Sequence, residues 1–168
     1  MIFKKSFFEG KVQSMHDFTV RKATLSDAFD IYNINKDSLG YDYAFEKQKR
    51  KIEVVLQDPT QALFVASADE KVVGYIHLVN YDVVYADNYK NVLGLAVLQA
   101  YKRRGIGTAL LQTAEKWAKE NGACGVRLCS GAEREEAHRF YSSAGYTEKK
   151  IQKNFRKVFS CAEQNGLR

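Results

Sequence analysis

A strand pattern that runs into a glycine turn and then a helix is the strongest constraint on this sequence. The apolar run at residues 91–98 predicts a buried strand, and the stretch KRRGIG at 102–107 places three cations and two glycines after it. The next helix has its apolar residues on one face: Ile106, Leu110, Ala114, Trp117 and Ala118. Such a helix start, with unpaired N–H groups and little side-chain bulk, is typical of a phosphate-binding site.

The other patterns predict a mixed α+β fold. Further strands are expected at 18–23, 62–68, 72–80, 124–130, 146–151 and 155–160. The second and third of these form a hairpin that turns near 69–71. Helices are expected after a cap at Thr24 or Ser26, over 44–57, and over 134–146. This order fits a mixed sheet better than a strict βαβ repetition.

Composition sets the class of protein. The chain has 168 residues, which suits one domain with a buried core; we expect it over residues 17–168, after an extension at 1–16. No window is long and apolar enough to span a membrane, and no secretion signal is seen, so we expect a cytoplasmic protein without membrane contact.

Two further counts bear on ligands. The three cysteines are odd in number and lack metal-ligand spacing, which disfavours a disulfide framework and a zinc site and favours reduced structural thiols. The net charge of +6 favours a phosphate-bearing partner, whether a nucleic acid, a nucleotide cofactor or an acidic protein.

The glycine turn departs from two common nucleotide motifs. Leu110 stands where a dinucleotide-binding fingerprint has its third glycine, and Thr108-Ala109 stands where an ATP loop has Lys-Ser/Thr. The turn does resemble the central motif of the GNAT superfamily of acyl-CoA-dependent N-acetyltransferases, Arg/Gln-x-x-Gly-x-Gly/Ala after a strand of the type LAV. A second signature of that family, A-x-x-FY-x-x-x-GF, is similar to AHRFYSSAGY at 137–146.

The resemblance covers residues 18–160 and implies a fold. This fold is a mixed, mostly antiparallel sheet of six to seven strands flanked by about four helices. Three positions differ from the family pattern: Lys102 replaces Arg or Gln, Gln99 replaces a common proline, and Arg134 replaces a frequent asparagine.

The resemblance also implies acetyl-CoA as co-substrate, no metal, and N-acetylation of a primary amine on a small molecule or a protein. The amine would attack directly in a ternary complex. The CoA diphosphate would lie on the turn, the pantetheine would pair with the preceding strand, and that strand would help to polarise the thioester carbonyl. The implied CoA-binding residues are Leu95, Ala96, Val97, Lys102, Arg103, Arg104, Gly105, Ile106, Gly107, Thr108 and Arg134.

Tyr141 matches the general acid of the family, which protonates the departing thiolate. An unperturbed phenol with a pKa of about 10 gives its proton to a thiolate with a pKa of about 8.5 at a cost of about 2 kcal/mol. The expected effect of Tyr141 is therefore modest, within about 10²–10⁴-fold. On spacing alone, the favoured interpretation of Tyr141 is a half-buried aromatic on a helix face.

The proton of the acceptor amine needs a destination as well. A lysine-like amine with a pKa near 10.4 is neutral in about one molecule in 2,500 at pH 7. The strand before the turn has no glutamate, so the sequence offers five weak candidates for the base: His77, Tyr81, Asp82, Tyr85 and Asp87. We leave His138, three residues before Tyr141, off the catalytic set because it can simply pack against its neighbours.

Substrate recognition is expected from the first two helices and from the loop YDVVYADNYK at 81–90, because loops carry specificity on a shared scaffold. The aspartates and tyrosines of this loop suit a cationic amine. Two rival hypotheses remain open. One is a basic nucleic-acid-binding module that uses YKRR and KKIQKNFRK, and the other is a CoA-binding sensor without activity. A homodimer is a further expectation.

Overall fold

The structure is a computed structural model that describes residues 18–159. The predicted extension at 1–16, together with Cys161, lies outside the described residues. The chain divides into two compact units, one up to Cys129 and one from Ser130 onward, and each is described by itself.

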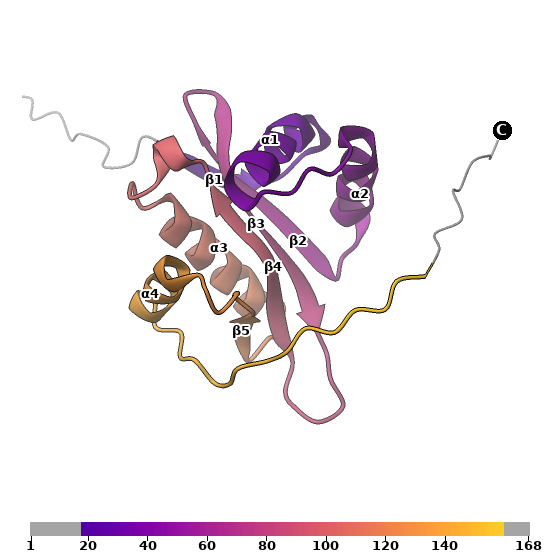
Figure 1. Cartoon of the computed structure of the whole chain (residues 1–168), viewed down its shortest axis with the longest axis vertical. Helices are drawn as coiled ribbons and strands as arrows, with labels where there is room; N and C mark the ends of the chain where they lie inside the picture. Colours follow the sequence, from indigo (N-terminus) through magenta and orange to yellow (C-terminus); the bar gives the residue numbers. More distant parts are fainter. Residues whose placement is uncertain (1–17, 160–168) are drawn as a thin grey trace, which may run out of the picture. The chain divides into compact units, whose positions relative to one another are not determined.

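The first unit contains the whole sheet (Figure 1). Its five strands, in chain order and also in their order across the sheet, are β1 (Thr19–Lys22), β2 (Gln61–Ala68), β3 (Lys71–Tyr81), β4 (Tyr89–Val97) and β5 (Gly125–Leu128). All neighbours pair antiparallel except β4 and β5, which are parallel. The mixed, mostly antiparallel sheet is confirmed, but the predicted count of six to seven strands is wrong for the described residues.

Local backbone geometry explains the central hairpin. Asp69 and Glu70 both have positive φ angles, 50° and 62°, and Ala68 pairs with Lys71 across the turn. A two-residue turn of this kind matches the right-handed twist of the strands it joins. The expected hairpin between 62–68 and 72–80 is therefore confirmed.

Helices cover both faces of the sheet (Figure 1). The first helical stretch begins with a 3₁₀ turn, η1 (Leu25–Asp27), and continues as α1 (Ala28–Leu39); α2 (Phe45–Gln57) follows on the same face, and α3 (Ile106–Glu120) lies on the other. Apolar residues of α1 and α2, including Ile31, Ile34 and Ile52, form one core with strand residues such as Val65. On the opposite face, Leu110 of α3 packs at Gly74, where an added Cβ would lie 3.3 Å from it. These helices match the predicted ones.

The start of the first helical stretch shows the expected cap. Asp27 accepts a hydrogen bond from the backbone N–H of Thr24 at 2.7 Å and from Arg21 Nη1 and Nη2 at 2.7 and 2.8 Å. Burial raises the pKa of Asp27, but these hydrogen bonds from Arg21 and Thr24 outweigh it, and the pKa lies below its ordinary value. Thr24, one of the two predicted caps, is the one used.

The second unit contains α4 (Glu135–Ser143) and the chain that follows it. Gly145 takes a φ of 88°, and the N–H of Tyr146 donates to the carbonyl of Tyr141 at 3.0 Å, which ends the helix as its glycine predicted.

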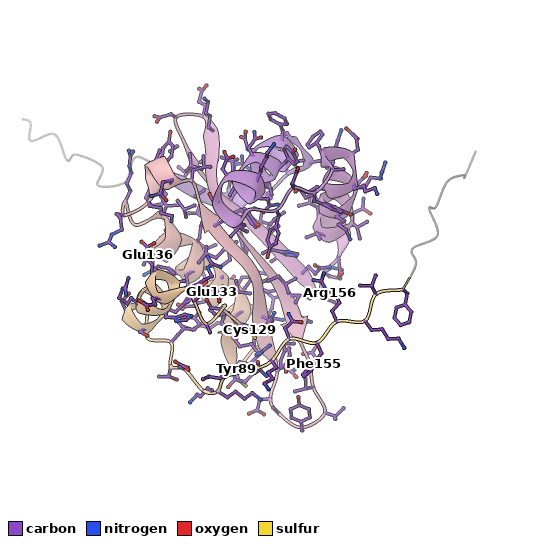
Figure 2. The ribbon with its side chains drawn as sticks, viewed as in Figure 1. Tyr89, Cys129, Glu133, Glu136, Phe155 and Arg156 are labelled. Atoms are coloured by element: carbon purple, nitrogen blue, oxygen red, sulfur yellow. The ribbon has the colours of Figure 1, made fainter. Side chains whose placement is uncertain are left out.

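The strands predicted near 146–151 and 155–160 are wrong for residues up to Phe159, because residues 144–159 contain no strand. Alternation gives a segment the propensity for a strand, but a strand also needs a partner edge for its backbone groups. The close positive charges of this stretch, which include Arg156 beside Phe155 in Figure 2, oppose such pairing as well.

Candidate active site

The glycine turn has the backbone geometry of an anion-binding helix start. Gly105 is the residue before α3 and has a φ of 82°, and an added Cβ there would meet nothing within 4 Å. The first intrahelical hydrogen bond of α3 runs from the N–H of Ala109 to the carbonyl of Gly105. The N–H groups of Ile106, Gly107 and Thr108 therefore have no partner within the helix. Their dipoles favour an anion in front of the turn.

Arg103 shows that the turn is held in an unusual shape. Its φ of 64° lies in the left-handed region, which costs a side-chain-bearing residue roughly 1–2 kcal/mol. Non-glycine residues held in this region cluster at ligand sites, because the surrounding structure must impose the conformation.

The side chains of the turn divide between solvent and core. Lys102, Arg103 and Arg104 are exposed, and Arg104 also lies over the ring of Tyr101 at 4.9 Å. Ile106 is 2% exposed, so its side chain belongs to the core and only its backbone can reach a ligand. The sequence predicted this set of residues, and the structure brings them together at one helix start.

Strand β4 has an open edge next to this turn. Strand β5 pairs with β4 only from Tyr89 to Val92, so residues 94–97 pair with β3 alone within the described chain. The register shifts between His77 and Leu78, which face Gly94 and Val92, and this leaves Leu93 as an extra residue in β4. Bulges of this kind often lie beside active sites. Leu95, Ala96 and Val97 thus keep one strand edge available for a further hydrogen-bonding partner.

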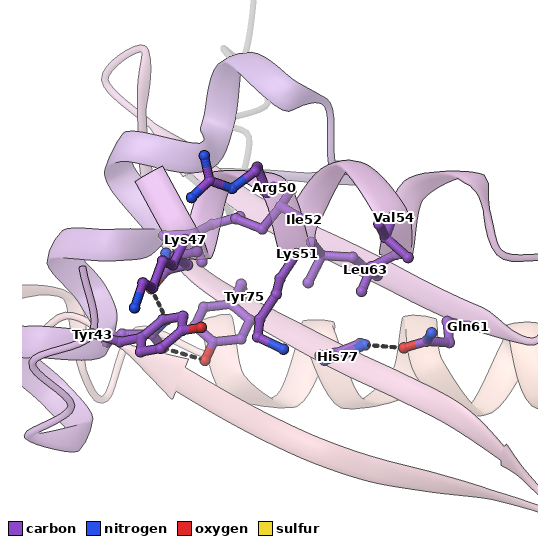
Figure 3. A pocket seen from close by; sticks show the side chains of 14 residues that line it. Tyr43, Lys47, Arg50, Lys51, Ile52, Val54, Gln61, Leu63, Tyr75 and His77 are labelled. Atoms are coloured by element: carbon purple, nitrogen blue, oxygen red, sulfur yellow. Dashed lines mark hydrogen bonds between the residues drawn. The ribbon is translucent and has the colours of Figure 1, made fainter. Parts of the chain in front are cut away.

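A cavity of about 670 Å³ lies on the face of the sheet that α1 and α2 cover (Figure 3). A volume of this size suits a small molecule. The residues that line it come from α1, the connection to α2, α2 itself, β2 and β3: Ile31, Asn35, Tyr43, Lys47, Gln48, Arg50, Lys51, Ile52, Val54, Val55, Gln61, Leu63, Tyr75 and His77.

The cavity adjoins the open strand. Tyr75 and His77 pair with Ala96 and Gly94 of β4, and the hydroxyl of Tyr75 would lie 3.3 Å from a Cβ placed on Gly94. The wall of the cavity is therefore one strand away from the residues predicted to bind the pantetheine.

A chain of hydrogen bonds crosses the cavity wall. The Tyr75 hydroxyl donates to Asn35 Oδ1, and Asn35 Nδ2 donates to Gln48 Oε1 at 3.0 Å. Burial, with a smaller contribution from Tyr41, raises the pKa of Tyr75 to about 12, so this phenol keeps its proton. Gln48 is 7% exposed, and its Nε2 has no hydrogen-bond partner in the described chain. The chain of bonds ends on an unused N–H donor.

Of the five candidate bases, only His77 lines the cavity. Its Nε2–H donates to Gln61 Oε1 at 2.9 Å, and burial lowers the pKa of His77 below its ordinary value, so the ring is neutral at pH 7. Tyr81 ends β3, and the others lie in the connection from β3 to β4: Asp82, Tyr85 and Asp87. A hydrogen bond with Tyr81 raises the pKa of Tyr85, which makes it a poor base at neutral pH.

The second unit holds Tyr141 and Arg134, which the sequence also singled out. Tyr141 is half-buried on α4, its ring lies 5.2 Å from Phe140 and 6.0 Å from Tyr146, and burial raises its pKa although Arg134 opposes the shift. Arg134 is exposed at the start of α4. His138 donates from Nε2 to the carbonyl of Gly131 at 2.9 Å, which gives it a structural role in the turn before the helix.

Sequence reasoning missed most of the cavity. It assigned recognition to the first two helices in general, but it did not single out Lys47, Gln48 or Lys51, because charged residues on a short helix usually form a solvated face. The spacing of Lys47, Lys51 and Val54, three or four residues apart on one helix face, was the available signal. Residues 82–88 of the loop expected to bind the substrate do not line the cavity.

Two absences concern the described residues only. Within 18–159, no group of three or more potential metal ligands gathers in one place. In the same range, no helix has both the length and the apolar character needed to cross a membrane. Cys124 and Cys129 are both exposed, which does not fit a structural role in the core.

The sequence is similar to one family of known proteins. The model of the Acetyltransferase (GNAT) family matches residues 28–146. The N-alpha-acetyltransferase of Sulfurisphaera tokodaii is 32% identical over 151 residues, which cover 83% of this chain and 86% of that protein. The aminoalkylphosphonate N-acetyltransferase of Salmonella typhimurium is 28% identical and covers 77% of this chain and 84% of its own length.

Solved structures agree on the fold. The aminoglycoside N-acetyltransferase AAC(6')-Iy in complex with CoA superposes with a TM-score of 0.76 at 18% identity, over 86% of this chain and 95% of its own. The family match spans more than half of the chain and includes both the glycine turn and α4. The chain therefore belongs to the GNAT acetyltransferase family, and it is an enzyme that transfers the acetyl group of acetyl-CoA to an amine.

Proposed function

We propose that the enzyme acetylates the primary amine of a small molecule by direct attack in a ternary complex, with the donor on β4 and α3 and the acceptor in the cavity under α1 and α2. The observation that carries this proposal is the position of the cavity wall: Tyr75 pairs with Ala96 of the open strand. An amine in the cavity is then one strand away from a thioester on β4.

The residues present fit acetyl-CoA. The open space at Gly105 and the unpaired N–H groups at the start of α3 suit a diphosphate, and Lys102, Arg103 and Arg104 add positive charge around it. The free edge of Leu95, Ala96 and Val97 suits the amide groups of a pantetheine arm. When bound, acetyl-CoA supplies an activated acetyl group. Arg134 is proposed as a further phosphate contact.

The proposed reaction moves two protons, one from Tyr141 and one to His77. The amine nitrogen forms its bond to the acetyl carbon as the carbon–sulfur bond breaks, and the phenol of Tyr141 gives its proton to the thiolate. Because burial raises the pKa of Tyr141, this transfer is more uphill than the cost of about 2 kcal/mol for unperturbed groups. We propose His77, through water, as the acceptor of the proton that the amine loses, because its neutral ring lines the cavity.

The similar proteins suggest two acceptor classes. N-alpha-acetyltransferase is the name of one relative, and another relative is named for aminoalkylphosphonates. We favour a small molecule because the cavity volume of about 670 Å³ suits one, and we keep a protein N-terminus as the second class. A cytoplasmic location and a homodimer remain parts of the proposal.

Thiol release from acetyl-CoA tests the proposal directly. Purified enzyme is mixed with acetyl-CoA and a panel of amino acids, aminophosphonates, polyamines, aminoglycosides and peptides, and CoA binding is measured separately. Amine-dependent release with at least one small amine supports the proposal. CoA binding without release would instead indicate a sensor, and retention on polynucleotide without CoA binding would indicate a nucleic-acid-binding module.

A further inference from the structure

The cavity of the first unit is positively charged. The residues that line it include Lys47, Arg50 and Lys51 but no aspartate or glutamate. Within residues 18–159, no ion pair joins any of these three cations to a carboxylate. All three are exposed, so a ligand in the cavity interacts with those cations whose side chains reach into it.

Lys51 is the cation best placed to contact a ligand. Figure 3 shows its side chain reaching from α2 towards the sheet, between Tyr75 and His77, whereas Arg50 points away from the sheet. Tyr75 and His77 are the residues that pair with β4. The positive charge of Lys51 thus lies over the part of the cavity nearest to the open strand.

Gln48 adds an independent observation. It is 93% buried, it lines the cavity, and its Nε2 lacks a hydrogen-bond partner in the described chain. A buried donor without a partner is costly, so a ligand acceptor atom at this place would satisfy it. With the Tyr75 hydroxyl donating to Asn35 Oδ1 and Asn35 Nδ2 donating to Gln48 Oε1, the free end of the chain is the donor Nε2, which suits an oxygen and not an ammonium group.

We propose that the acceptor is a small amine that also carries a carboxylate, phosphate or phosphonate group, and that Lys47, Lys51 and Gln48 Nε2 bind this oxyanion. The inference rests on the proposed function and names its substrate class. It modifies the expectation from loop 81–90, whose aspartates and tyrosines suited a cationic amine and not an acidic substrate, because the cavity presents cations and an amide donor instead.

The same charge assists the chemistry. Attack needs the neutral form of the amine, and a nearby cation disfavours its protonated form. An oxyanion held by Lys47 and Lys51 would keep the substrate bound while its amine gives up a proton. A dicationic amine has no such anchor and meets repulsion from both lysines.

Matched acceptors provide the first test. We would compare kcat/KM, from thiol release, for β-alanine and 2-aminoethylphosphonate against ethanolamine and putrescine. We expect kcat/KM for one or both anionic amines to be about tenfold or more higher than kcat/KM for ethanolamine. This difference should become smaller as salt is added. The two anionic compounds distinguish a carboxylate from a phosphonate site. A preference for ethanolamine or putrescine would overturn the proposal, and so would a preference for acidic peptides over every small amine.

Variants provide the second test. Lys51→Gln and Lys47→Gln should each raise the KM for the anionic amine by about tenfold and should not raise the KM for ethanolamine, which loses a repulsive charge. Gln48→Glu retains an acceptor for Asn35 but turns the free donor into an anion, so it should raise the same KM. The matched control is Lys49→Gln, an exposed residue of α2 outside the cavity, which should change neither KM. Equal effects at Lys49 and Lys51 would overturn the proposal.

A binding measurement separates this proposal from the proposed function. Methylphosphonate and acetate are titrated into the wild-type enzyme and the Lys51→Gln variant by NMR, without acetyl-CoA. Binding that Lys51→Gln weakens supports the oxyanion site even if no amine releases thiol, in which case the proposed function alone fails. The absence of binding by both anions, together with acetylation of neutral amines, would overturn the oxyanion site and leave the proposed function intact.

Discussion

Gly105 is the single residue on which the glycine turn depends most. Its φ of 82° is strained for any other residue, and the space beside it is open. Gly105→Ala should lower the free energy of unfolding by about 1 kcal/mol and raise the Kd for CoA several-fold, because the helix start shifts. Calorimetry and chemical denaturation measure the two effects.

Gly122, which follows α3, supplies the control for that change. Its φ is 68°, and its surroundings are equally open. Gly122→Ala should cost a similar free energy of unfolding but leave CoA binding unchanged. Equal weakening of CoA binding by both variants would mean that the turn has no special part in binding.

Tyr141 allows a direct test of acid catalysis. Tyr141→Phe keeps the ring and its contacts with Phe140 and Tyr146 but removes the acidic proton. We expect kcat to fall within about 10²–10⁴-fold, with the Kd for CoA nearly unchanged. Steady-state kinetics and a binding titration measure the two quantities, and an unchanged kcat would remove Tyr141 from the mechanism.

Among the elements, the start of the first helical stretch depends on Asp27. Its carboxylate binds Arg21 and the backbone of Thr24, and its pKa is lowered. Asp27→Asn should lower the free energy of unfolding at pH 7 by about 1–2 kcal/mol, because charge-assisted hydrogen bonds are lost. Asp37→Asn, at an exposed position of α1, is the control and should change little.

The lowered pKa of Asp27 determines how the stability difference between wild type and Asp27→Asn changes with pH. A carboxyl whose pKa is lower in the folded state stabilises the protein fully above its unfolded pKa of about 3.9. This stabilisation is lost as the pH falls through that value and then through the folded pKa. Denaturation curves from pH 7 to pH 3 should therefore show wild type and Asp27→Asn converging. If the difference in the free energy of unfolding stayed constant with pH, the ionised carboxylate of Asp27 would not be the source of the stabilisation.

The elements also show where sequence reasoning succeeds. Periodicity and caps predicted α2, α3 and the β2–β3 hairpin, because each is specified by local pattern and turn chemistry. The strand predictions within residues 146–159 were wrong, because strand pairing depends on a free sheet edge far away in the sequence and not on local alternation. The single-residue bulge at Leu93 is also invisible in the sequence, because it arises from the register between β3 and β4.

On the scale of the whole molecule, the site could be predicted only in part. The residues proposed to bind the donor form a contiguous motif, so Lys102 to Thr108 could be named from sequence alone. The cavity proposed for the acceptor is assembled mainly from α1, α2, β2 and β3, and its residues are separated by as many as 46 positions from Ile31 to His77. Such a site becomes visible only when the sheet brings the four elements together.

The fold should respond as a whole to donor binding. If acetyl-CoA binds only the folded state, it adds about 2.7 kcal/mol to the free energy of unfolding at a concentration of 100 times Kd. Alternate backbone amides of residues 94–97 face the open edge and should exchange with deuterium slowly once CoA is bound. Hydrogen exchange read out by mass spectrometry checks this, and unchanged exchange there would contradict pantetheine pairing on β4.

The open edge of β4 also affects how the protein behaves in solution. A strand with unpaired backbone groups is a template on which another chain can add, which is a route to self-association. A pantetheine arm on residues 94–97 would occupy the same hydrogen-bonding groups and block that route. In the proposed complex, donor binding and self-association therefore compete for one short stretch of backbone, and concentrated enzyme should stay monodisperse for longer when CoA is present.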